Sequence, residues 1–137
     1  MTTQAGAILQ YARDAMVSSG GAGLALWARC SALLTRQALE AALDEFWEQQ
    51  RAPGVKSGSR HSQLLCLGSY LGDDQLSARV AHTWAALSNA CHYHSYELVP
   101  TAGELEGWIE TVDTFAACCR QVPTPKRPDS PPVERHE

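Results

Sequence analysis

The residues of this sequence best suited to chemistry gather in one stretch, SNACHYHSYELVPT, at positions 88–101. Between them, Asn89, Cys91, His92 and His94 offer an amide, a thiol and two imidazoles. Histidine acts as a general acid or base near neutral pH, and a thiolate is a nucleophile or a metal ligand. The stretch therefore suggests three kinds of site: metal-binding, nucleophilic and acid–base.

The spacing argues against a metal site. Ligands that share a metal from one helix usually lie three or four residues apart, because only these spacings share a face. Cys91, His92 and His94 are one or two residues apart, and no paired CxxC or i,i+4 histidine pair occurs. Zinc would need ligands from other helices, such as His61 or Cys66. We therefore expect neither a metal nor another cofactor.

Nucleophilic catalysis is not predicted either. The sequence has no GxSxG elbow, P-loop or dinucleotide-binding fingerprint. His92 directly follows Cys91, and adjacent residues of a helix point in different directions. A cysteine–histidine pair is therefore not expected here, and an acid–base role for His94 remains the simplest catalytic reading.

The elements that carry these residues are predicted to be helical. Alternating strand patterns are nearly absent, and alanine and leucine dominate. The sequence predicts an all-α bundle of four or five helices, with a loop at 51–60. The expected helices cover residues 4–17, 23–50 and 61–71, then one that starts at Asp73 or Asp74 and one capped by Thr101 and Glu104.

The fourth expected helix has one apolar face, on which His94 also falls. Its residues recur in steps of three or four, as one side of a helix requires. A histidine on such a stripe is often an interior residue with its hydrogen bonds satisfied. We also expect Val80, Trp84 and Leu87 to supply an interface. The stripe is Leu76, Val80, Thr83 with Trp84, Leu87, Cys91 and His94.

Composition places these helices in one domain, residues 1–120, followed by a flexible proline-rich tail at 121–137. The net charge of −4 argues against generalised binding to nucleic acid but leaves room for a local basic patch. No apolar run is long enough to span a membrane, and no secretory signal is apparent. Five cysteines form no disulfide framework. We therefore expect a cytoplasmic protein.

Two features resemble the HEPN family (higher eukaryotes and prokaryotes nucleotide-binding domains) over roughly residues 5–120. They are the long helix LLTRQALEAALDEFW and a later helix that ends in an asparagine–histidine cluster. Family members are bundles of four or five helices that generally dimerise, and many are metal-independent RNases. Active members carry an arginine, often a polar residue next, and a histidine four to six residues on. SNACHYH places Ser88 at the arginine, Asn89 at the polar position and His94 at the histidine.

The serine determines what the resemblance implies. Arginine offers a fixed positive fork to the scissile phosphate, and serine cannot. The expected function is therefore a non-catalytic module that dimerises or binds a protein partner, in a toxin–antitoxin or phage-defence setting. The alternative is a metal-independent endoribonuclease that uses His94 and Asn89, with RNA contacts from Arg79 and His92 and the missing charge from Arg79 or Arg60. A helical sensor that binds a small ligand is a third hypothesis.

Overall fold

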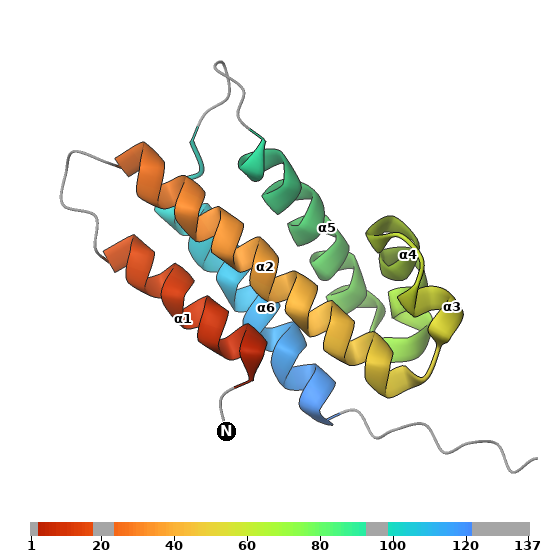
Figure 1. Cartoon of the computed structure of the whole chain (residues 1–137). Helices are drawn as coiled ribbons and strands as arrows, with labels where there is room; N and C mark the ends of the chain where they lie inside the picture. The colour runs from red at the N-terminus through yellow and green to blue at the C-terminus, as the bar shows by residue number, and fades with distance from the viewer. Residues whose placement is uncertain (1–2, 18–23, 93–98, 122–137) are drawn as a thin grey trace, which may run out of the picture.

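The computed structural model describes residues 3–17, 24–92 and 99–121, which form six α-helices and no strand (Figure 1). The predicted all-α class is confirmed. The proline-rich tail from residue 122 lies outside the described residues. The helices are α1 (Gln4–Val17), α2 (Leu24–Gln50), α3 (Pro53–Lys56), α4 (Arg60–Leu71), α5 (Asp74–Cys91) and α6 (Ala102–Gln121).

Four long helices, α1, α2, α5 and α6, lie side by side as a bundle (Figure 1). The 27-residue α2 is at its centre, because it packs against each of the other three. Helix α4 packs on α5, and the short α3 connects it to the end of α2. The predicted bundle is therefore present, with α3 and α4 as a side branch.

Side-chain caps fix where α5 and α6 begin. The Leu76 amide donates to the Asp73 carboxylate at 3.0 Å, and Gly72 turns the chain out of α4 with a φ of 72°. Thr101 and Glu104 form the predicted capping box: the Glu104 amide donates to Thr101 Oγ1 at 3.1 Å, and the Thr101 amide donates to Glu104 Oε1 at 3.4 Å. Both predicted helix starts are confirmed.

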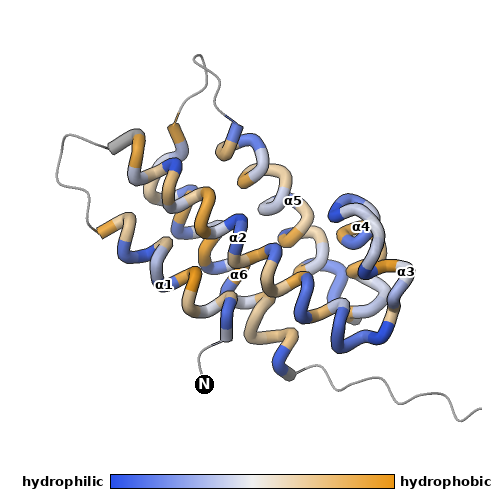
Figure 2. The backbone as a smooth tube through the Cα atoms, viewed as in Figure 1, coloured by the Kyte–Doolittle hydropathy of each residue, from blue (hydrophilic) through white to orange (hydrophobic). Residues whose placement is uncertain are grey.

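The core forms where the apolar faces of the helices meet, and the hydropathy along the helices alternates accordingly (Figure 2). Three aromatic side chains are its largest members. The Phe46 ring lies 5.0 Å from that of Trp47 and 5.9 Å from that of Phe115, between centroids. All three are fully buried, and they join α2 to α6.

Small residues bring α1 close to α2. Ala12 of α1 and Ala32 of α2 have no exposed surface, and the Ser31 hydroxyl donates to the Ala12 carbonyl at 3.1 Å. The buried Thr35 hydroxyl donates to the Ser31 carbonyl at 2.7 Å, one turn away. The polar groups in this contact are therefore paired, as burial requires.

Two helix boundaries differ from the sequence prediction. The expected loop at 51–60 contains α3, which begins at Pro53, and proline is well suited to a first helical position because it lacks an amide hydrogen. Helix α5 ends at Cys91, where His92 adopts an extended ψ of 123°. The stripe predicted to continue to His94 therefore stops earlier, because apolar periodicity does not fix where a helix ends.

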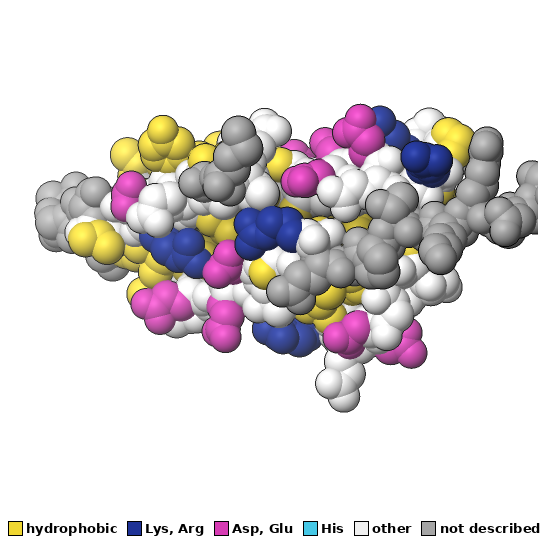
Figure 3. Space-filling model, turned by 90° about the horizontal axis from the view of Figure 1, so that it is seen from below, with side chains coloured by type: hydrophobic (Ala, Val, Ile, Leu, Met, Phe, Trp, Pro, Cys, Tyr) yellow, Lys and Arg dark blue, Asp and Glu magenta, His cyan; other side chains and the backbone are white. Residues whose placement is uncertain are grey.

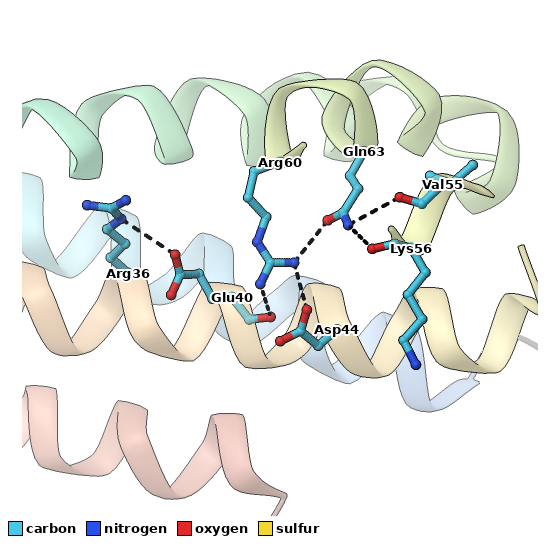
Figure 4. A network of polar contacts seen from close by, with 7 residues as sticks. All are labelled: Arg36, Glu40, Asp44, Val55, Lys56, Arg60 and Gln63. Carbon is cyan, nitrogen blue, oxygen red and sulfur yellow. Dashed lines mark hydrogen bonds and ion pairs between the residues drawn. The ribbon is translucent and has the colours of Figure 1, made fainter. Parts of the chain in front are cut away.

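A polar network ties the side branch to α2 (Figure 4). Arg60, at the start of α4, lies 2.8 Å from the Asp44 carboxylate and donates to Gln63 Oε1 at 2.9 Å. The buried Gln63 amide in turn donates to the carbonyls of Val55 and Lys56 at 3.3 and 3.1 Å. One arginine therefore links α2, α3 and α4.

Charges on the surface are mixed. On the face in Figure 3, basic and acidic side chains are interspersed, with hydrophobic atoms between them. That distribution provides no broad single-sign field on this face. None of the described helices combines the length and apolarity of a membrane span.

Replacing Leu87 with alanine should destabilise the fold by about 2–5 kcal/mol, because its side chain is completely buried and its removal leaves a cavity. Urea unfolding measures the change. Leu65→Ala is the matched control: Leu65 is 72% exposed, so its loss should cost less than about 0.5 kcal/mol. Equal effects of the two substitutions would contradict this packing of α5.

Candidate functional site

The predicted catalytic stretch lies at the C-terminal end of α5. Asn89 is exposed on the last turn, and the exposed His92 caps the helix, its amide donating to the Asn89 carbonyl at 3.2 Å. His94, predicted as the acid–base residue, lies outside the described residues. Asn89 and His92 therefore share the accessible end of one helix, and their roles in phosphate or RNA contact stay predictions.

An arginine from another helix reaches this part of α5. The Arg36 guanidinium of α2 lies 4.9 Å from the Trp84 ring centroid, and it is close enough to the Cys91 thiol to act on its pKa. Trp84, Ser88 and Cys91 are four and three residues apart, so they lie on one side of α5. Positive charge is thus present on the side of the helix that carries Ser88. In the sequence, the spacing of Arg36 relates it only to Glu40, four residues further along α2.

The surroundings of Ser88 and Arg36 contain unused polar groups. Ser88 Oγ and Arg36 Nε are buried, with no hydrogen-bond partner among the described residues. Glu40 Oε1 lies 3.8 Å from Arg36 Nε, too far for a hydrogen bond, although the two form a loose ion pair. Arg36 is therefore held by the Trp84 ring and by the loose ion pair with Glu40, and the cation–π contact contributes about 0.5–1 kcal/mol.

Cys91 is not activated as a nucleophile. Burial raises the pKa of the thiol above its ordinary value of 9.0, and the nearby Arg36 guanidinium only partly opposes that rise. A raised pKa means that the thiol stays protonated at neutral pH. Burial therefore disfavours the thiolate form of Cys91, and the expectation of no cysteine nucleophile stays a prediction.

Arg79, predicted to contact nucleic acid, lies away from the C-terminal end of α5 and bonds to α6. Its Nη2 donates to Thr111 Oγ1 of α6 at 3.2 Å, and no carboxylate of the described residues pairs with it. Arg79 lines a groove between α5 and α6 whose volume is about 350 Å³. His82 and Trp108 line the same groove, and sequence reasoning missed both. For His82 a signal was present, because its three-residue step from Arg79 places these two residues on one side of α5. Arg60, the other candidate cation, is bound in the α2–α4 network.

The three residues predicted to supply an interface lie at different depths. Val80 and Leu87 have no exposed surface and pack within the core of this chain. Trp84 is half-buried beside Arg36. Of the three, only Trp84 retains surface that a partner could touch, so most of the apolar face of α5 is used inside the bundle.

Exposed apolar surface occurs on α2 instead. Leu26 is 69% and Leu33 46% exposed, and the exposed Cys30 lies between them, four residues after one and three before the other. These steps place all three on one outward stripe. Tyr11 of α1, 65% exposed, lies at the same level, because its neighbour Ala12 accepts the hydrogen bond from Ser31. We call Leu26, Cys30 and Leu33 the outer stripe.

The cysteines should differ in reactivity toward a maleimide at pH 7.5. Cys30 is exposed on the single chain and should react first in a sample dilute enough to be monomeric. Cys91 should follow, because burial raises its pKa and lowers the thiolate fraction. Cys119 should react last, because it is buried and its pKa is raised to about 12. Mass spectrometry of peptides from timed samples gives the order, and fast labelling of Cys119 would contradict the packing of α6.

No three histidine, cysteine, aspartate or glutamate side chains within residues 3–17, 24–92 and 99–121 are grouped to bind a metal ion. Comparisons of the chain with protein-family models, with curated proteins and with solved structures find no match. The geometry of the described side chains is therefore what bears on function.

Proposed function

We propose that this chain is a HEPN-like helical module that acts by self-association through the outer stripe of α2. The HEPN resemblance of the sequence and the four-helix bundle are compatible with that role. The observation that carries it is the symmetry of the apolar residues in and beside the outer stripe: counted from Cys30 in either direction, they occur at three and four steps. They are Trp27 and Leu26 on one side, and Leu33 and Leu34 on the other.

This pattern suits a two-fold contact. In an antiparallel pair of α2 helices centred on Cys30, residue 30 + n of one copy faces residue 30 − n of the other, so apolar residues face apolar residues. Leu26 and Leu33 are the most exposed of the set, and Trp27 and Leu34 are half-buried beside them, where they also pack against the core. Tyr11 extends the contact onto α1. Contiguous exposed apolar residues of this kind are typical of protein–protein interaction sites.

Self-association is tested by light scattering with Leu26→Asp. Burying one leucine contributes about 1.5–3 kcal/mol, and the dimer buries two copies, so the dissociation constant should rise by more than about a hundredfold. Leu65→Asp is the matched control, since Leu65 is 72% exposed on α4, away from the outer stripe, and should leave the dimer intact. In addition, a short bismaleimide should join two copies through Cys30, and Cys30→Ser should abolish that product. A folded wild-type monomer at high concentration would refute the proposal.

A second function, metal-independent RNA cleavage, is favoured by the position of Arg36. This arginine provides a positive charge on the side of α5 that carries Ser88, the residue that stands where the HEPN motif has its arginine. A cation near a cleaving phosphate stabilises the charge that develops in the transition state. In this proposal Arg36 binds the phosphate, Asn89 holds an oxygen, and His94 acts as acid or base.

RNA cleavage in excess chelator tests this second function. Arg36→Gln and His94→Ala should each lower the rate by at least about a hundredfold, and Arg51→Gln, which changes an exposed arginine just after α2, should not. Circular dichroism confirms that each variant is folded. A wild-type protein with no cleavage, or one equally active after Arg36→Gln, would eliminate this function.

A further inference from the structure

The groove between α5 and α6 combines an arginine, an imidazole, an indole and two threonines on an apolar base. We propose that it binds a small planar anion, an aromatic ring that carries a phosphate or a carboxylate. This inference concerns a face other than the outer stripe and is independent of self-association. The lining residues are Ala78, Arg79, His82, Thr83, Trp108 and Thr111.

Arg79 is positioned but not neutralised. The Thr111 hydroxyl donates to the Gly107 carbonyl at 3.0 Å, which leaves its oxygen to accept from Arg79 Nη2 at 3.2 Å. Thr111 is only 5% exposed, so it anchors the guanidinium from below. This contact uses one of five N–H donors, and no ion pair within the described part of the chain involves Arg79. The remaining donors can face the groove.

Trp108 and His82 suit the ring of the ligand. The half-buried indole of Trp108 offers a flat apolar surface, and His82 lies one turn after Arg79 on α5 with its imidazole exposed. Thr83 is buried below them. Mostly apolar lining with a few convergent polar groups is the usual composition of a small-molecule site.

Charge and size narrow the class of ligand. The guanidinium fork matches the paired oxygens of a carboxylate or phosphate, which a neutral molecule lacks. A volume of about 350 Å³ is near the lower end for ligand pockets, so one ring system with one anionic group fills it. The net charge of −4 and the mixed surface give a long polyanion little further attraction.

Two matched pairs of probes test the proposal in the full-length protein, by saturation-transfer NMR titration. Adenosine 5′-monophosphate is compared with adenosine, and indole-3-acetate with indole-3-acetamide. Each pair differs only in its anionic group, and the two pairs separate phosphate from carboxylate. Inorganic phosphate, which has no carbon-bound protons to observe, is added as a competitor of adenosine 5′-monophosphate and tests whether the ring contributes. At least one anion should bind at least about tenfold more tightly than its neutral counterpart and than phosphate.

Variants assign the binding to the groove. Arg79→Gln should remove the preference for the anion, and Trp108→Leu should weaken both members of the preferred pair. Arg120→Gln is the control: it changes an exposed arginine at the end of α6, and the variant should bind the probes as the wild type does. Because Arg79 is exposed, its replacement leaves the core intact, and a thermal melt checks this. No saturable binding of any probe by the wild type, or undiminished preference in Arg79→Gln, would overturn the proposal.

Discussion

The close approach of α1 to α2 is the constraint on which the rest of the bundle depends. Ala12 and Ala32 have no exposed surface, and the Ser31 hydroxyl reaches the Ala12 carbonyl across the interface. Larger side chains at these positions would separate the two backbones and break this bond. With one side of α2 covered by α1, two further sides receive α5 and α6. Its outward side is left uncovered, which is why the leucines of the outer stripe face solvent.

The parts of the fold that could be predicted from sequence are those set by local chemistry. Helix α6 starts after Thr101 because the side chains of Thr101 and Glu104 each accept a hydrogen bond from the backbone amide of the other. Helix α5 starts after Asp73 for a similar local reason, since its carboxylate accepts from the Leu76 amide. Helix α3 was missed because its sequence, PGVK, looks like a turn, and the end of α5 was missed because apolar spacing continued past it. Boundaries of this kind depend on tertiary context.

The candidate sites depended on contacts between helices, which spacing within one helix does not encode. Arg36 was visible only as a neighbour of Glu40, yet its guanidinium lies over Trp84 of another helix. Similarly, the hydroxyl that orients Arg79 comes from Thr111, thirty-two residues further along the chain. The apolar stripe of α5 predicted an interface, but periodicity cannot distinguish a partner's surface from the chain's own core, and Val80 and Leu87 lie in the latter.

The way in which α3 and α4 are attached to the bundle determines how stable this branch is. It is joined to α2 by the Arg60–Asp44 pair, whose carboxylate is 64% exposed, and by the edge-on contact of Tyr70 with Trp47. An exposed pair of this type contributes only about 0–1 kcal/mol. The stability of the branch therefore rests on Leu64, Leu67 and Leu71 of α4, which are buried in the core, so loss of one of these leucines would loosen it more than loss of the ion pair.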